Sequence, residues 1–224
     1  MKTISSSLTA YQIILDKIIN NELKPGEVIT EVSLSEKLGL SRTPVRDAVQ
    51  RLEMEGLVVT ENRTKKIYYL TPLDIENIFD LKISIESTIA RLAAEKGTDK
   101  QMNELGDIVL TIHDLLIERK NNPERMDHFF ERWIEADKKF HAKLFEISDN
   151  QRAEQIITTL NTQWHRIKMG LSAIEGRIEK SAFEHKAIGN AIISRKPEEA
   201  EQAVIKHLTN LKDVLLKIMQ AFNI

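Results

Sequence analysis

The chain has 224 residues, of which 42% are hydrophobic and 29% charged, with eight glycines and five prolines. This length exceeds that of a usual single domain, and the composition excludes a disordered or collagen-like chain and favours a helix-rich globular protein of two domains. The absence of cysteine excludes disulfides, thiolate metal sites and a cysteine nucleophile, so histidine and carboxylates are the strong metal ligands that remain.

Neither targeting nor membrane insertion is indicated by the sequence. Residues 1–10 are rich in Ser and Thr and lack a basic region followed by an apolar run, and no stretch resembles a membrane span. We therefore expect a cytoplasmic protein. The formal net charge of −2 gives no overall sign of a nucleic-acid partner, so local charge has to be considered.

Three short helices are predicted in the first 56 residues. Apolar residues recur at helical spacing over 8–19, and this helix stops before Lys24-Pro25-Gly26. Ser33 is the expected N-cap of a second helix over 34–38, which Gly39 ends. Thr43 is the expected N-cap of a third helix, with Pro44 at its first position and its end at Gly56. Two helices joined by a tight turn predict a helix-turn-helix.

A β-hairpin is predicted directly after these helices. The segments 57–60 and 67–70 are rich in β-branched and aromatic residues, and the polar segment 61–66 separates them. A hairpin behind a helix-turn-helix corresponds to the wing of a winged helix-turn-helix.

Every strongly periodic segment beyond Thr71-Pro72 has helical spacing, which predicts a domain boundary there. The expected fold is mainly α, with a winged helix-turn-helix over 1–72 and an all-α antiparallel bundle over 73–224. The six expected bundle helices cover residues 72–95, 99–120, 123–147, 150–168, 177–195 and 197–222.

Basic residues gather at the start of the third helix and in the hairpin. Arg42 and Arg46 are four residues apart and share a helical face, and an arginine can donate two hydrogen bonds to the O6 and N7 atoms of guanine. The hydroxyls of Ser41 and Thr43, with free N–H groups at the helix start, suit a phosphate oxygen. The hairpin adds the cations Arg63, Lys65 and Lys66. This ordered set favours double-stranded DNA over a merely solvated surface.

The same segments carry a resemblance to a known family. Residues 23–26 (LKPG), 38–48 (LGLSRTPVRDA) and 51–58 (RLEMEGLV) resemble the winged helix-turn-helix of the GntR family. The resemblance implies a dimeric repressor or activator that contacts DNA through Arg42, Thr43 and Arg46, with minor-groove contacts from the wing. Two departures stand out: the wing tip lacks the usual glycine, and Val32 stands where some members have an arginine that contacts DNA.

A candidate metal site lies in the second half of the chain. Asp137 and His141 are four residues apart on one predicted helix, so both can face one cation, and His185 and His207 lie in two further predicted helices. One carboxylate and three imidazoles suit Zn²⁺, Ni²⁺, Mn²⁺ or Fe²⁺. From the residues alone, ordinary core or surface histidines remain an open alternative, and we expect nothing more of His113, His128 and His165.

The second half also resembles a known group, the FCD subgroup of GntR regulators. The resemblance rests on residues 137–141 (DKKFH), Asn150, residues 184–185 (EH), residues 191–192 (AI), and Ala200 with His207. It implies a helical bundle that holds a metal through Asp137, His141, His185 and His207, with a small organic acid bound beside it. Lys82 and Arg166 are candidate partners of a carboxylate effector, and a solvated surface position is an alternative for each.

Three functions are therefore compared. The leading hypothesis is a homodimeric transcriptional regulator that binds operator DNA and responds to a small carboxylate metabolite at or near the metal site. A metal-dependent enzyme is the second, although no general base or nucleophile accompanies the Asp/His cluster. The third is a nucleic-acid-binding structural protein whose helical domain serves only for dimerisation.

Overall fold

The computed structural model describes the backbone of residues 6–121, 129–171, 174 and 176–221, with the side chains of these residues except Ser6 and 164–171. It is mainly helical with one small antiparallel sheet, which confirms the predicted fold class. The chain divides into two compact units, one of residues 1–71 with 161–169 and the other of residues 72–160 with 170–224.

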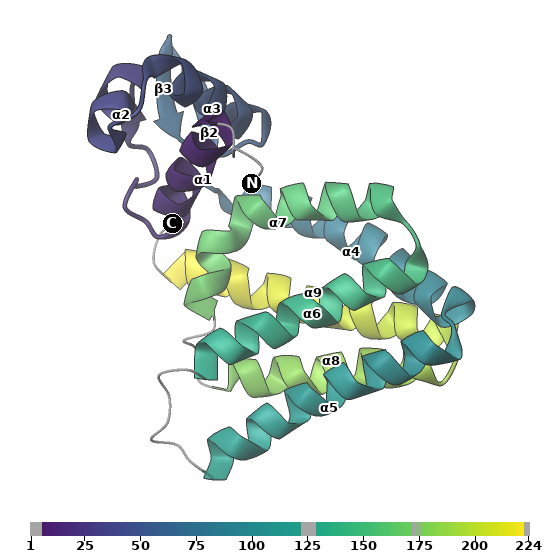
Figure 1. Cartoon of the computed structure of the whole chain (residues 1–224). Helices are drawn as coiled ribbons and strands as arrows, with labels where there is room; N and C mark the ends of the chain where they lie inside the picture. The colour runs from purple at the N-terminus through teal and green to yellow at the C-terminus, as the bar shows by residue number, and fades with distance from the viewer. Residues whose placement is uncertain (1–5, 122–128, 172–173, 175, 222–224) are drawn as a thin grey trace. The chain divides into compact units, whose positions relative to one another are not determined.

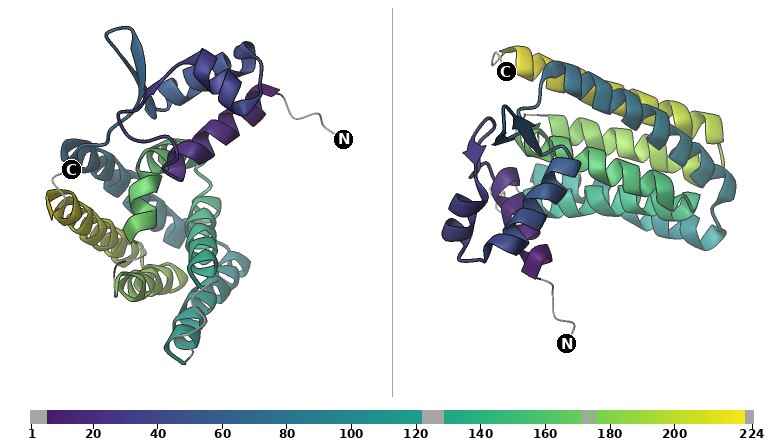
Figure 2. Two further views of the ribbon diagram at one scale, coloured as in Figure 1. Left: turned by 90° about the vertical axis from the view of Figure 1, so that its left-hand side faces the viewer. Right: turned by 90° about the horizontal axis from the view of Figure 1, so that it is seen from above.

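Within its described residues 6–71, the first unit combines three helices with a three-stranded sheet (Figures 1 and 2). In chain order the elements are α1 (Ser6–Ile19), β1 (Val28–Ile29), α2 (Glu31–Leu38), α3 (Arg42–Met54), β2 (Val58–Glu61) and β3 (Thr64–Ile67). The sheet order is β1-β3-β2 with antiparallel pairing throughout. Apolar residues at helical spacing on α1 and α3, such as Ile14 and Val49, pack with Ile67 of the sheet into one core.

Two predicted helix starts are wrong, that of α2 by three residues and that of α3 by two. Helix α2 begins earlier than expected, because Thr30 rather than Ser33 is the N-cap and its hydroxyl accepts a hydrogen bond from the Ser33 N–H at 3.1 Å. Helix α3 begins at Arg42 after Ser41, so Thr43 lies inside the first turn. Pro44 is tolerated there because the first N–H groups of a helix have no intrahelical partner. Gly39 ends α2 in the left-handed conformation, as predicted.

The hairpin is tighter than expected. Its second strand is Thr64–Ile67 rather than 67–70, and Glu61 pairs directly with Thr64. The connection is therefore only Asn62 and Arg63, with φ of 50° and 63°. Two central residues of positive φ correspond to a turn of type I′, whose twist matches that of the flanking strands. The polar residues 64–66 thus belong to the sheet, and the short strand β1, which was not predicted, pairs with β3.

The second unit is built from long helices, as predicted (Figure 1). They are α4 (Pro72–Lys96), α5 (Asp99–Asn121), α6 (Phe129–Ser148), α7 (Gln151–Leu171), α8 (Arg177–Ile193) and α9 (Pro197–Ala221), of which residues 161–169 of α7 belong to the first unit. The expected bounds hold to within three residues where the structure describes them, while residues 123–128 and 222 lie outside the described part.

Helices α4, α6, α8 and α9 surround the centre of the bundle, with α5 packed against α6 and α8. Phe79, Ile89, Leu105 and Phe140 are among its fully buried side chains. Gly189 fixes the approach of α8 to α5, because a Cβ at this position would lie only 2.5 Å from a methyl carbon of Val109. This close packing holds the part of α8 that includes His185, one helical turn before Gly189.

Candidate nucleic-acid interface and candidate metal centre

The start of α3 presents an exposed polar surface above a buried apolar stripe. Ser41, Arg42, Thr43 and Arg46 are all exposed, whereas Val45, Ala48, Val49 and Leu52 are buried in the core. The Ser41 side chain forms no capping hydrogen bond, so the first N–H groups of α3 remain available to an anion. Neither arginine forms an ion pair with any residue that the structure describes. Their guanidinium groups are thus available to bases or phosphates.

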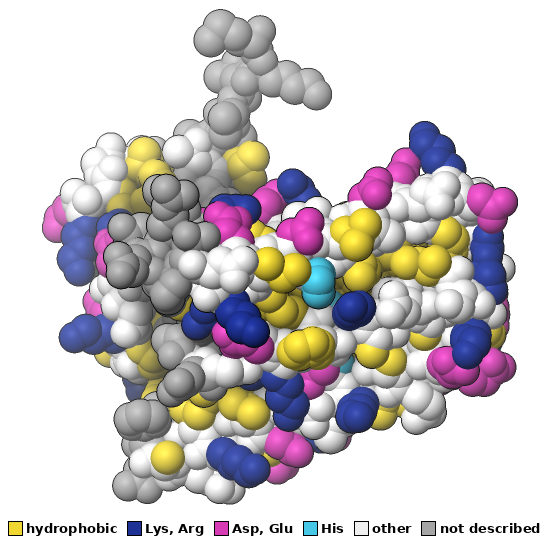
Figure 3. Space-filling model, turned by 90° about the horizontal axis from the view of Figure 1, so that it is seen from below, with side chains coloured by type: hydrophobic (Ala, Val, Ile, Leu, Met, Phe, Trp, Pro, Cys, Tyr) yellow, Lys and Arg dark blue, Asp and Glu magenta, His cyan; other side chains and the backbone are white. Residues whose placement is uncertain are grey.

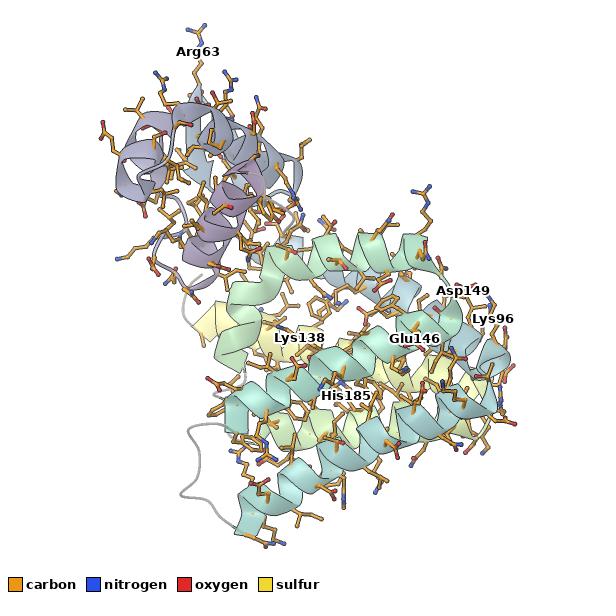
Figure 4. The ribbon with its side chains drawn as sticks, viewed as in Figure 1. Arg63, Lys96, Lys138, Glu146, Asp149 and His185 are labelled. Carbon is orange, nitrogen blue, oxygen red and sulfur yellow. The ribbon has the colours of Figure 1, made fainter. Side chains whose placement is uncertain are left out.

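The cations of the wing differ from one another. Arg63 lies at the tip of the hairpin, where it is exposed and projects away from the unit (Figure 4). Lys65 instead forms an ion pair with Glu53 of α3, and Lys66 pairs with Glu61 at 3.0 Å. These pairs partly neutralise both lysines. Among the described residues of the hairpin, Arg63 therefore retains the most available positive charge.

The four predicted metal ligands lie together inside the second unit. Asp137 and His141 come from α6, His185 from α8 and His207 from α9. One ring nitrogen from each of the three histidines lies within 4.8 Å of those of the others. The Asp137 Oδ1 atom is 3.8 Å from His141 Nε2 and 3.6 Å from His185 Nε2. The packing of three helices thus brings one carboxylate and three imidazoles to a common centre.

Water has little access to this centre. His185 is fully buried and is labelled within the bundle in Figure 4, while a quarter of the His141 side chain is exposed. The ring of His185 lies 4.6 Å from that of Phe140 and stacks against Trp133 at 5.9 Å, measured between centroids. These aromatic neighbours fix the ring plane of His185 while its Nε2 atom faces Asp137.

Glu184 has a role that the sequence analysis did not assign. Its Oε2 atom accepts hydrogen bonds from His207 Nδ1 at 2.7 Å and from Arg177 at 3.1 Å, and its Oε1 atom accepts one from Asn210 at 2.8 Å. Because Nδ1 of His207 is engaged, Nε2 is the atom left to bind a metal. Burial alone would raise the pKa of Glu184, but His207, Arg177 and Asn210 outweigh it and lower the pKa to about 2.

A second carboxylate lies on the other side of the centre. Glu86 of α4 is buried, forms an ion pair with Lys82, and has its Oε2 atom 3.7 Å from His141 Nδ1. Burial would raise the pKa of Glu86, but Lys82 and His141 together lower it. Lys82, predicted as a partner of the effector, is thus engaged by Glu86. The four-residue spacing of Lys82 and Glu86 is the signal that indicates this pair.

The donor set fits a divalent transition metal. Bonds of about 2.0–2.2 Å to nitrogen and oxygen place neighbouring ligand atoms roughly 3 to 3.5 Å apart. The 3.6 and 3.8 Å from Asp137 to two histidines therefore require a small contraction, and the histidine nitrogens, which lie within 4.8 Å of one another, require a larger one. Histidine with an outer carboxylate on Nδ1, as in His207 and Glu184, is the usual arrangement at such sites. Arg166, the other predicted effector contact, lies on α7, but its side chain is outside the described residues, as are those of His128 and His165.

Comparison with protein-family models places both units in known groups. Residues 6–64 match the model described as "Bacterial regulatory proteins, gntR family", and residues 77–210 match the FCD domain. The chain is a GntR-family transcriptional regulator with an FCD domain. Members of this family are regulators, so the GntR-type chain is not an enzyme and the metal-dependent enzyme hypothesis is rejected.

The chain is also similar in sequence to individual transcriptional regulators over most of its length. It is 30% identical to the Uxu operon regulator of Haemophilus influenzae over 210 residues, which cover 84% of this chain and 73% of the relative. It is 27% identical to the HTH-type transcriptional repressor RspR of Escherichia coli, covering 94% of this chain and 89% of the relative.

A solved structure shows the same fold. E. coli McbR/YncC superimposes with a TM-score of 0.69 at 18% identity, covering 96% of this chain and 99% of that chain. Among the described residues of the GntR regulator, no helix is long and apolar enough to cross a membrane.

Proposed function

We propose that this GntR regulator is a cytoplasmic homodimer whose residues 1–72 bind operator DNA and whose residues 73–224 bind a divalent metal ion and a small carboxylate effector. The observation that carries the proposal is the convergence of Asp137 with three histidines from α6, α8 and α9 inside the bundle. A bundle that served only for dimerisation would not need this buried polar cluster, which costs free energy unless its groups are partnered.

For the DNA contacts, we assign base recognition to Arg42 and Arg46 and phosphate contacts to Ser41 and Thr43. Exposure of all four side chains at the start of α3 supports this assignment. Arg63 is the wing cation with the strongest case for a DNA contact, and Lys65 and Lys66 add positive charge that Glu53 and Glu61 partly offset. We assign a repressor role because the relative RspR is described as a repressor.

For the effector site, Asp137, His141, His185 and His207 would hold Zn²⁺, Ni²⁺, Mn²⁺ or Fe²⁺. When bound, the ion supplies a positive charge and open coordination positions that a carboxylate oxygen can occupy. Lys82 contributes through its pair with Glu86 rather than as an available cation. Arg166 remains a second candidate for the effector.

The test combines metal analysis with DNA binding. We expect one divalent ion per chain in purified or reconstituted protein, and an affinity for operator DNA that changes when the effector is added. Linkage requires that operator DNA change the effector affinity by the same factor, on the order of 5- to 150-fold. Protein that retains no stoichiometric metal after reconstitution with Zn²⁺, Ni²⁺ and Mn²⁺ would refute the metal centre.

A further inference from the structure

Helices α5 and α8 carry a group of large apolar side chains on their solvent-exposed sides. Phe183 of α8 is 64% exposed, and Leu110 and Ile117 of α5 are 60% and 46% exposed. A single exposed apolar residue is common on protein surfaces, whereas several on adjoining helices are typical of an interaction site. Since α5 packs directly against α8 (Figure 1), these three residues belong to one face of the bundle.

Two contacts fix the register of α5 and α8. A Cβ atom at Gly189 would lie 2.5 Å from a methyl carbon of Val109, and Arg119 pairs with Glu179 at 3.3 Å. From Val109 to Arg119 the opposite position on α8 therefore falls from Gly189 to Glu179. The two helices are thus antiparallel and stay in step over this stretch.

This register places Phe183 opposite position 115 of α5, between the levels of Leu110 and Ile117. Leu110 and Ile117 are seven residues apart, which is about two helical turns, so they lie on one stripe of α5 roughly 10 Å apart. A gap of this length between two aliphatic side chains can receive a side chain from a neighbouring helix, as in the knobs-into-holes packing of coiled coils. Phe183 has the matching level on the adjoining helix.

Charged side chains flank the apolar residues, and their sign differs between the two helices. Asp107 and Asp114 lie on the exposed apolar stripe of α5, whereas Lys180 and Lys186 lie three residues before and after Phe183 on α8. All four charged residues are exposed. Neither lysine forms an ion pair within the part of the chain that the structure describes. Helix α5 thus presents an acidic and apolar stripe, and α8 presents a basic and apolar one.

From these complementary stripes we infer that the face formed by α5 and α8 is the surface on which a second copy of this chain docks. A two-fold axis that runs along the helices, between α5 and α8, sets α5 of each protomer on α8 of its partner in antiparallel orientation. Phe183 then lies between Leu110 and Ile117 of the partner, and Asp114 faces the partner's Lys186. Because a two-fold interface uses the same patch on both subunits, each contact forms twice.

A second copy fits this surface better than an unrelated protein does. An acidic partner would match only α8 and a basic partner only α5, whereas another copy presents both stripes at the required spacing and register. The inference rests on the homodimer of the proposed function and adds the surface through which the two copies meet.

The opposite side of α8 faces the candidate metal centre. His185 is fully buried there and Glu184 accepts a hydrogen bond from His207, while Phe183 is exposed. The dimer contact and the candidate metal centre therefore share this helix.

Sedimentation equilibrium of the full-length protein measures the dimer directly. Phe183→Glu places a carboxylate in the apolar contact twice per dimer, so the dissociation constant of the dimer should rise at least about 30-fold. Ile156→Glu is the matched control, because Ile156 is 50% exposed on α7 and belongs to neither stripe. The control should dimerise as the wild type does.

Charge reversal tests the pairing of α5 with α8. Asp114→Lys and Lys186→Glu each set like charges against one another at both contacts, so each variant alone should dimerise at least about tenfold more weakly. In an equal mixture of the two variants, a heterodimer of near wild-type affinity should form, because each of its contacts again joins opposite charges. Both residues are exposed, so neither substitution disturbs the core, and the mixture decides the matter if Phe183→Glu fails to fold.

The outcomes separate this inference from the proposed function. Unchanged dimerisation of folded Phe183→Glu, or a mixture that associates no more tightly than either charge variant alone, would overturn the inference while the homodimer stands. Wild-type protein that remains monomeric would instead refute the homodimer itself, and the inference with it.

Discussion

The two units present their functional groups in opposite ways. In the first, Arg42 and Arg46 are exposed, lie within one short segment and rest on a buried stripe of α3. In the second, the candidate ligands are mostly buried and come from three helices. The proposed DNA-contact residues therefore need only one helix to present them, whereas the candidate metal ligands meet only when α6, α8 and α9 are packed together.

The charged side chains of the two units differ in their surroundings for the same reason. An exposed arginine stays hydrated, and its electrostatic attraction to DNA phosphates weakens as the salt concentration rises. The buried charges of the bundle are compensated locally, as in the pairs of Lys82 with Glu86 and Arg177 with Glu184. On the face that Figure 3 shows, acidic and basic side chains of the described residues are interspersed over the bundle. We therefore expect a mutation in one unit to leave the binding function of the other unit unchanged, and the following variants test this expectation.

Loss of a central ligand should have the largest effect. His185→Ala should lower metal affinity by more than about 100-fold, since even outer partners of metal ligands are worth about 10- to 100-fold. Basal DNA affinity should not change, because the proposed DNA contacts lie in the other unit. Competition with a chelator and fluorescence anisotropy with operator DNA measure the two quantities.

His113→Ala is the control for that experiment, because His113 is a bundle histidine that lies partly exposed beside Asp114. It should bind metal as the wild type does. Equal metal loss in both variants, or metal retained by His185→Ala, would contradict the assigned centre.

A substitution in the first unit should instead reduce DNA binding and leave metal binding unchanged. Arg46→Ala should weaken operator binding by about 1 to 3 kcal/mol and relax specificity at one base position per half-site, if Arg46 donates two hydrogen bonds to a guanine. Metal affinity should stay the same. Lys66→Ala should have a smaller effect that is similar for all sequences, because Glu61 already pairs with this lysine. Unchanged affinity and specificity of Arg46→Ala at fixed salt would show that another element reads the bases.

We expect an intermediate loss of metal affinity when Glu184, the hydrogen-bond partner of His207, is changed. Glu184→Gln keeps the side-chain size but removes the charge that holds the Nδ1 proton of His207, so metal affinity should fall about 10- to 100-fold. Glu179→Gln, on the same helix but paired with Arg119, should retain it. A purely structural role would lower the free energy of unfolding of the metal-free protein and leave the metal affinity of the folded protein intact.

Local signals in the sequence predicted the first unit closely. The exposed residues Ser41, Arg42, Thr43 and Arg46 lie in one segment, so their position follows once α3 is identified. The predicted starts of α2 and α3 were wrong because two nearby residues can each serve as the N-cap: Thr30 or Ser33 for α2, and Ser41 or Thr43 for α3. The second strand was predicted too late in the chain because residues 68–70 are also β-prone. The turn that precedes it is in fact only Asn62 and Arg63, shorter than the polar segment 61–66 indicated.

The candidate metal centre was predictable only in part. Spacing placed Asp137 and His141 on one face, but their meeting with His185 and His207 depends on how α6, α8 and α9 pack. The residues alone left these histidines ambiguous, and the family resemblance supplied the set. Glu184 was not assigned because its contact with His207 crosses from α8 to α9, and no pattern within one helix indicates such a contact.

The smallest expected effect concerns a partly buried hydrogen-bond network of the first unit, in which Tyr11 and Arg51 share the carboxylate of Glu55. The Tyr11 hydroxyl donates to Glu55 at 2.7 Å, and Arg51 donates to the same carboxylate at 3.0 Å. Burial, then the hydrogen bond and charge of Glu55, raise the pKa of Tyr11 to about 12. Because the folded pKa exceeds the unfolded value of 10, this contribution to stability is complete below pH 10 and is lost as pH rises towards 12.

Tyr11→Phe tests the contact through unfolding rather than through binding. The variant should lose about 1 kcal/mol of unfolding free energy at pH 7, measured in urea, because it removes one hydrogen bond to a carboxylate. Its stability should then fall less steeply than that of the wild type between pH 10 and 12. Metal affinity and operator affinity at pH 7 should remain those of the wild type, since Tyr11 supports α3 from the buried side. Equal pH dependence in the two proteins would mean that the Tyr11 hydroxyl is no more shielded than a tyrosine in the unfolded chain.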